Sequence, residues 1–312
     1  MPPLPCKRRW AQGAAVLVLG LAGVYFVGAL SQHIGSIPPI DWSLSALLVF
    51  ALTALLMLLN FVLGGIMWRW LLVEQGQTLT TGRAVSIIGM SQIGKYLPGN
   101  VGHFVGQVGL AKVAGVPVGL CMTTMLIFNL WLVAIGTALG AAGFWLFMDI
   151  STRVNWPQPE PWGVVVLAVL ALASPWLGLW SLNRWWPALA LKLGNGHPPK
   201  LPTVKTAVAL ALGFALTFVM FGFMVQLQAT HLFGMPSGDW LSFTLMFATA
   251  WVAGYVLPGA PGGLGVREAM VVALLTPVVG AGAAIGLSIT MRLATVAGDG
   301  LAFGLGWLLK TK

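Results

Sequence analysis

The stretch GKYLPGNVG, residues 94–102, returns 160 residues later as GYVLPGAPG, residues 254–262, with five identities in nine positions. In each copy, proline and glycine interrupt a hydrophobic segment. Interrupted segments in corresponding positions of the two halves of a membrane protein are typical of a substrate site. The repeat therefore predicts where the site of this chain lies.

Composition places the chain in a membrane. Charged residues make up 7% of it and hydrophobic residues 58%, whereas soluble domains are roughly 25% charged. The 16 basic and 7 acidic residues give a net charge of +9. No basic cluster lies on a soluble module able to grip a duplex, which argues against a nucleic-acid partner. We assign the excess to loops that orient the protein and contact anionic lipid.

Six continuous apolar runs predict simple transmembrane helices, because about 20 apolar residues cross a hydrocarbon core of ~30 Å. They are residues 11–30, 43–68, 117–148, 162–182, 206–231 and 284–309. The first run comes after three basic residues, and a signal peptide is its alternative interpretation. Because it is longer than a usual signal core and more spans come after it, we expect it to remain uncleaved.

Two further segments, 84–112 and 241–277, predict re-entrant helical hairpins. Ala84 to Leu97 is 14 residues, or ~21 Å of helix, which is too short to cross untilted. Pro98 and Pro258 remove backbone donors, and the glycines after them release the chain from helical geometry. The alternative is that both segments are kinked full spans.

These elements predict an all-α integral membrane protein with one polytopic domain, residues 1–312. Its half-repeats are about 11–148 and 162–309, and the second starts on the opposite side of the membrane from the first, as in inverted-repeat transporters. In this topology nearly all basic loop residues fall on one side. That asymmetry predicts that both termini lie in the cytoplasm. We expect the protein to lie in the cytoplasmic (inner) membrane of the cell.

The first hairpin predicts an anion site. If a half-helix restarts near Asn100, its first amides point into a cavity, and asparagine is a favoured N-cap. Lys95 lies about one turn earlier and Gln107 flanks the loop. Pro98, Gly99 and Gly102 are the predicted breaks in the helix. The alternative is that these residues only cap and pack the hairpin.

The second hairpin and the last span supply the other candidate charges. Arg267 can donate two hydrogen bonds to a phosphate, and Glu268 suits a first helical turn; adjacent residues point in different directions, so the two need not pair. Arg292 and Asp299, seven residues apart, share a face of the last span. A purely structural buried pair is the alternative for them. The predicted breaks in this hairpin are Pro258, Gly259, Pro261, Gly262, Gly263 and Gly265.

We expect no catalytic residue, metal or cofactor. The two cysteines and four histidines are isolated, so no disulfide or metal pattern is present. No nucleotide-binding loop is present either.

The two motifs together, residues 94–102 and PGGLGVRE at 261–268, resemble the lysylphosphatidylglycerol synthase transmembrane family. This is the flippase-like region of multiple peptide resistance factor proteins, which also occurs as stand-alone proteins. The resemblance implies a lipid-translocating membrane domain with the two hairpins around the headgroup path. The chain ends at Lys312 without the aminoacyl-transfer domain of full-length synthases, so we expect a stand-alone member.

The predicted function is a lipid flippase for an anionic or phosphate-containing lipid, including glycosylated or polyprenyl-linked lipids. One alternative is a non-catalytic membrane partner of a glycosyltransferase or of an envelope-lipid assembly complex. A less favoured one is a lipid-modifying membrane enzyme, for which Glu268 and Asp299 would be the only deep carboxylates. The expected partners are membrane lipids and a glycosyltransferase or lipid-modifying enzyme.

Overall fold

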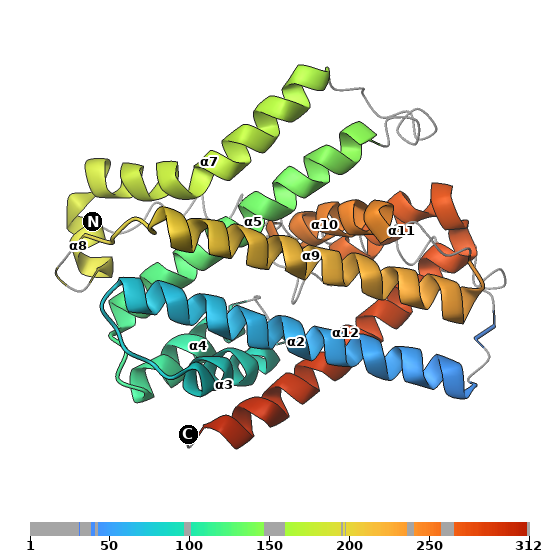
Figure 1. The fold of residues 1–312 in the computed structure, drawn as a ribbon, viewed down its shortest axis with the longest axis horizontal. Helices are drawn as coiled ribbons and strands as arrows, with labels where there is room; N and C mark the ends of the chain where they lie inside the picture. Colours follow the sequence, from blue (N-terminus) through green and yellow to red (C-terminus); the bar gives the residue numbers. More distant parts are fainter. Residues whose placement is uncertain are drawn as a thin grey trace.

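A computed structural model describes residues 31, 39–40, 43–96, 101–146, 160–194, 196, 198–235, 240–256 and 265–310, and this part of the chain contains helices and no strand. Figure 1 shows the helices as a bundle in which long helices cross one another. Their bounds are α2 (Leu44–Glu74), α3 (Thr81–Ser91), the 3-10 helix η2 (Gln92–Tyr96), α4 (Gly102–Val113), α5 (Val118–Leu146), α7 (Pro161–Trp185), α8 (Pro187–Leu193), α9 (Val204–Phe233), α10 (Trp240–Val256), α11 (Val266–Val279) and α12 (Ala281–Leu309).

Five of these helices are long and apolar enough to cross a membrane: α2, α5, α7, α9 and α12. They correspond to five of the six predicted spans, and the sixth, 11–30, lies outside the described residues. Side-chain caps set two of the starts, because Ser43 accepts a hydrogen bond from the Ala46 amide and Thr203 one from the Thr206 amide. Both residue types satisfy first-turn amides that lack intrahelical partners.

The predicted interruptions separate four short helices into two antiparallel pairs. In the first pair, a Cβ on Gly94 would lie 2.5 Å from the carbonyl carbon of Gly102, so η2 and the start of α4 touch through backbone. In the second, a Cβ on Gly254 would lie 2.8 Å from the Cβ of Arg267, where α10 meets α11. Gly94 and Gly254 are the first residues of the two motif copies. The repeated glycine therefore has the same role in both hairpins, which is to let the two arms approach.

None of the four hairpin helices is long enough to cross the hydrocarbon core upright. α3 has 11 residues, α4 has 12, α10 has 17 and α11 has 14, against about 20 for a span. The chain between the arms, residues 97–100 and 257–264, lies outside the described residues. It holds the predicted breaks Pro98, Gly99, Pro258, Gly259, Pro261, Gly262 and Gly263. Gly265, at its edge, has a φ of +85°, a conformation that favours glycine.

The last helix of each half packs against elements of the other half. α12 packs against α3 and α2, while α5 packs against α10 and α9, so each half's last helix contacts the other half's hairpin and the long helix that precedes that hairpin. α2 and α9 lie side by side and antiparallel (Figure 1), with Gln228 Nε2 3.3 Å from Thr53 Oγ1. Thr290 on α12 donates a hydrogen bond to Gln228 Oε1, 2.8 Å away, and ties a third helix to this pair.

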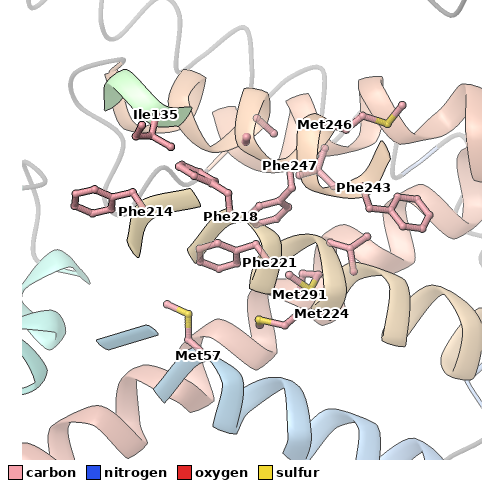
Figure 2. Close-up of a cluster of buried hydrophobic side chains, with 14 of the residues drawn as sticks. Met57, Ile135, Phe214, Phe218, Phe221, Met224, Phe243, Met246, Phe247 and Met291 are labelled. Carbon is pink, nitrogen blue, oxygen red and sulfur yellow. The ribbon is translucent and has the colours of Figure 1, made fainter. Parts of the chain in front are cut away.

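The main apolar core lies where α9, α10, α5 and α12 meet. Figure 2 shows aromatic rings of α9 and α10 facing one another, and Phe221 and Phe247 stack with ring centroids 4.9 Å apart. α7 lies at the edge of the bundle, where it packs against α5 and α8. The core therefore holds the long helices of both halves and the second hairpin together.

Candidate functional site

A cavity of about 200 Å³ lies between the two hairpins. Nine of the eleven described elements contribute to its wall, and α7 and α8 do not. Phenylalanine, tryptophan and tyrosine rings make up much of the wall, with a few polar groups among them. The polar lining residues are Asn60, Gln92, Lys95, His103, Gln107, Asn129, Thr217, Tyr255, Arg267 and Thr295.

Three of the predicted site residues meet in this cavity. Lys95 comes from η2, Gln107 from α4 and Arg267 from α11, so both hairpins contribute. Lys95 and Arg267 are 172 positions apart in sequence, and the antiparallel hairpins bring them to one wall. Asn100 lies outside the described residues. The N-cap of α4 is Val101, which makes no side-chain capping bond. The prediction of Asn100 as the N-cap was therefore wrong, because the helix begins two residues after it, at Gly102.

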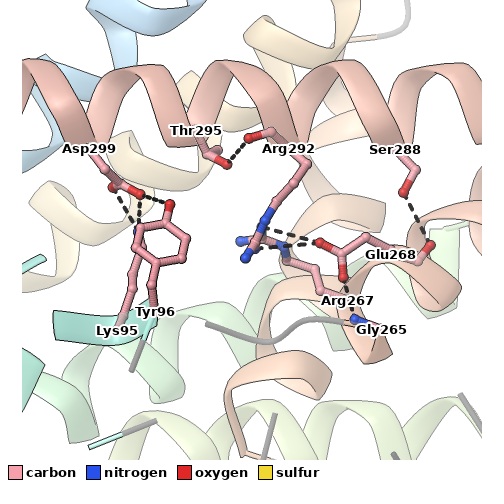
Figure 3. Close-up of polar contacts among 9 residues, drawn as sticks. All are labelled: Lys95, Tyr96, Gly265, Arg267, Glu268, Ser288, Arg292, Thr295 and Asp299. Atoms are coloured by element: carbon pink, nitrogen blue, oxygen red, sulfur yellow. Dashed lines mark hydrogen bonds and ion pairs between the residues drawn. The ribbon is translucent and has the colours of Figure 1, made fainter. Parts of the chain in front are cut away.

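Asp299 holds one of the two cavity cations. Lys95 Nζ lies 2.7 Å from Asp299 Oδ1 and 2.7 Å from Oδ2, and the Tyr96 hydroxyl donates a hydrogen bond to Oδ2 (Figure 3). The Asp299 side chain is 2% exposed. A buried carboxylate is stable only when it is paired and hydrogen-bonded, and these two neighbours in the first motif supply both interactions.

Glu268 is the counter-ion of the other cations. Its Oε1 lies 3.6 Å from Arg267 Nη2 and 3.5 Å from Arg292 Nη1, and its Oε2 accepts a hydrogen bond of 2.8 Å from the Gly265 amide (Figure 3). Glu268 thus caps the first turn of α11, as predicted. The adjacent Arg267 and Glu268 form an ion pair, which the sequence analysis left open, and both arginines approach the same Glu268 oxygen.

The last helix, α12, supplies one charged residue to the ion pair of Lys95 and one to the ion pairs of Glu268. Asp299 pairs with Lys95 of the first hairpin, and Arg292 pairs with Glu268 of the second. Each of the two charged residues of α12 therefore contacts a different hairpin. Neither lines the cavity directly, and neither does Glu268. The three therefore lie behind the cavity wall, where they position Lys95 and Arg267.

The five side chains of this site carry three formal positive charges and two negative ones. One positive charge is left in excess in a largely buried region, where the side chains of Lys95, Arg267 and Arg292 are 17%, 14% and 14% exposed. Charge in such surroundings is costly without a counter-ion. The arrangement can accept one further anion.

Several residues that face the cavity were not singled out from the sequence. Tyr255 stands at the motif position of Lys95, and its hydroxyl donates a hydrogen bond to Asn129 Oδ1 on α5. The motif alignment is the signal that could have identified it. Asn60, near the middle of α2, is the sole amide side chain in the predicted span 43–68, and that isolation was its signal.

Residues 11–302 match the family described as Lysylphosphatidylglycerol synthase TM region. The chain belongs to this family. The match covers both hairpins and all five described long helices except the last turns of α12, and it confirms the resemblance seen in the two motifs. The lysylphosphatidylglycerol synthase TM region is a membrane domain associated with lipid flippase function. No curated protein and no solved structure matches the chain.

Proposed function

We propose that this member of the lysylphosphatidylglycerol synthase TM family is a flippase for a lipid with an anionic, phosphate-containing headgroup. The observation that carries the proposal is the cavity between the hairpins, which has one cation from each hairpin and an excess of one positive charge. A phosphodiester carries one negative charge and would balance that excess.

The two cations suit the two parts of this task. The planar guanidinium of Arg267 can donate two parallel hydrogen bonds to phosphate oxygens. Lys95 is a compact point charge on a flexible chain, and it can turn from Asp299 towards an arriving phosphate. The charged and polar side chains of the cavity wall lower the cost of taking a charged headgroup out of water, while the acyl chains remain in the bilayer.

The contacts of each half's last helix with the hairpin of the other half support the following route for lipid movement. We infer that the two halves are inverted repeats, that both hairpins are re-entrant, and that the site faces each leaflet in turn as the halves rock against each other. The antiparallel packing of α2 against α9 and the matching contacts at Gly94 and Gly254 support this inference. We place the protein in a bacterial cytoplasmic membrane with both termini inside, on the basis of its loop charges.

Reconstitution of the purified chain into vesicles tests the proposal. Acyl-chain fluorescent phosphatidylglycerol, phosphatidylcholine and an uncharged glycosyl diacylglycerol are each mixed into the vesicles, and a membrane-impermeant quencher reports the fraction that changes leaflet. We expect the anionic lipid to move faster than in vesicles without protein and faster than the other two. Equal movement of anionic lipids with and without protein would refute the proposed function.

A further inference from the structure

We propose that the two bodies that rock against each other are the two halves of the chain with their last helices exchanged. Body A consists of α2, α3, η2, α4 and α12, and body B consists of α5, α7, α8, α9, α10 and α11. This rests on the proposed function and identifies the parts of the molecule whose relative movement that function requires.

Backbone contacts join α12 to the rest of body A. α12 packs against α3 and α2 (Figure 1). A Cβ on Gly89 of α3 would lie 2.4 Å from the carbonyl oxygen of Ala302, and a Cβ on Gly298 would lie 2.5 Å from the Cβ of Met57 on α2. Where backbones approach this closely, no flexible side chain lies between them that could repack. α12 is therefore expected to move with α2 and α3.

Body B is built in the same way around α10. α5 and α9 both pack against this helix. A Cβ on Gly143 of α5 would lie 2.7 Å from the Cβ of Leu245, and a Cβ on Gly222 of α9 would lie 2.6 Å from the amide nitrogen of Thr244. α5 is therefore expected to move with the second hairpin, although it belongs to the first half of the chain.

Side chains mediate the contacts between the two bodies. α2 and α9 meet at Gly213, where an added Cβ would lie 2.3 Å from the sulfur of Met67, and methionine is a flexible side chain that repacks readily. Arg292 Nη1 of body A lies 3.5 Å from Glu268 Oε1 of body B. Such side chains can change rotamer or partner as two surfaces shift, so the interface between the bodies can move more easily than the interfaces within them.

Two short joints connect the bodies in the described part of the chain, and each contains a glycine with a positive φ. Gly115, between α4 and α5, has a φ of +84°, and Gly280, between α11 and α12, has a φ of +82°. Both glycines come after the second arm of a hairpin, and no neighbouring atom lies within 4 Å of a Cβ added to either. Hinges are a few residues at the ends of elements that absorb backbone rotation, and glycine allows the widest range. The two joints suit this role.

The cavity lies between the bodies, with Lys95 on body A and Arg267 on body B. The contacts of the two corresponding motif residues stay within a body, because Lys95 pairs with Asp299 in body A and Tyr255 donates to Asn129 in body B. A boundary between the sequence halves would pass through both contacts. The exchange therefore lets the two sides of the cavity separate while each cation remains supported.

Cross-links distinguish these bodies from the sequence halves, in a chain from which Cys6 and Cys121 have been removed. Two cysteine pairs join different halves within one body: Met90→Cys/Gly306→Cys in body A and Gly143→Cys/Leu245→Cys in body B. A Cβ on Gly306 would lie 2.9 Å from Met90 Cγ, and both pairs are close enough for a disulfide once the helices adjust.

A third pair, Gln228→Cys/Thr290→Cys, joins α9 to α12 within one half but across the bodies, where Thr290 donates a hydrogen bond to Gln228. A short bifunctional thiol reagent takes the place of the glutamine side chain. We expect both disulfides to leave phosphatidylglycerol movement at the rate of the reduced proteins, and the third cross-link to abolish it. Rocking of the sequence halves predicts the reverse.

The six single-cysteine variants, treated alike, are the controls and should each move lipid at the same rate before and after treatment. Monodisperse elution in detergent verifies folding. Loss of movement when either disulfide forms, or unchanged movement with the third cross-link, overturns the proposed bodies. If the reduced proteins move no lipid above the level of vesicles without protein, the proposed function fails instead.

A distance measurement then tests the bodies without relying on transport. Spin labels at Val113→Cys and Lys310→Cys lie on different halves but on one body, whereas labels at Val204→Cys and Lys310→Cys lie on one half but on different bodies, and all three positions are exposed. Between phosphatidylcholine and phosphatidylglycerol nanodiscs, we expect the first distance to hold and the second to change. A change in the first distance, or no change in either, overturns the proposal.

Discussion

Lys95 Nζ lies within 2.7 Å of each carboxylate oxygen of Asp299, although 204 positions separate the two residues in the chain. The contact ties the tip of the first hairpin to the middle of the last long helix. It also makes Lys95 both a structural residue and a cavity residue. Substitutions at this position must therefore be designed so that loss of the fold and loss of the site can be told apart.

The first prediction concerns this pair. Lys95→Ala leaves a carboxylate that is 2% exposed without its counter-ion, and we expect it to lower the free energy of unfolding by about 3–5 kcal/mol. The double variant Lys95→Ala/Asp299→Ala should recover most of that loss, because no buried charge remains unpaired. Unfolding of the four proteins in mixed detergent measures the cycle. Additive effects of the two substitutions would contradict a coupled pair.

The second prediction separates the two arginines that share Glu268. Arg267 lines the cavity and Arg292 does not. Arg267→Gln should reduce lipid movement about 10–100-fold, as expected for a charge-assisted interaction of ~1.5–3 kcal/mol, and Arg292→Gln should reduce it less. Each variant leaves Glu268 one arginine partner and removes one positive charge, so the two are matched in charge. Equal losses of transport would show that charge alone, and not position on the wall, is what matters.

The third prediction concerns the close contact inside the first hairpin. Gly94→Ala places a Cβ about 2.5 Å from the Gly102 backbone, which must shift, and overpacking of this kind costs ~1–3 kcal/mol. Gly109→Ala, on the same hairpin, has no atom within 4 Å of the added Cβ. The thermal midpoint of Gly94→Ala in detergent should fall, and that of Gly109→Ala should hold. A lower midpoint in the control alone would mean that the arms do not meet at Gly94.

The fourth prediction tests whether the first hairpin is re-entrant. Single cysteines replace Gln77, before α3, and Val113, at the exposed end of α4, in a chain whose own Cys6 and Cys121 are changed to serine and alanine. If the hairpin enters and leaves on one side, a membrane-impermeant maleimide should label both from the same side of oriented vesicles. Ser43→Cys, at the other end of α2, should be labelled from the opposite side. Labelling of positions 77 and 113 from opposite sides would establish a full crossing.

Sequence was sufficient for the long helices because their signal is local. A run such as 206–231 must be apolar along its whole length to face lipid, and the helix there, Val204–Phe233, extends it by two residues at each end. The pairs of short helices could also be predicted, since proline and glycine act on the backbone where they stand, and the re-entrance of each pair stays a prediction. Gly94 and Gly254 marked both hairpins through the repeat, and the structure adds the contact that requires them.

The pairing of side chains that are distant in the chain could not be predicted from the sequence in the same way. Lys95, Arg292 and Asp299 were recognisable as costly charges at membrane depth, but nothing in their spacing shows that Asp299 belongs to Lys95 and Arg292 to Glu268. Those partners result from the packing of α12 against both hairpins. Asn60 stands out in the sequence as the one amide of its span, but only the structure shows that its amide is buried without a hydrogen-bond partner among the described residues.

The odd number of charges around the cavity has an electrical consequence. With a monoanionic phosphodiester bound, the five ionised side chains and their cargo sum to zero, so a voltage across the bilayer does no work on the loaded form. The empty form retains one positive charge, for which each 100 mV is worth ~2.3 kcal/mol per charge moved fully across. In the proposed flippase cycle, any influence of the resting potential should thus fall on the return of the protein without its lipid.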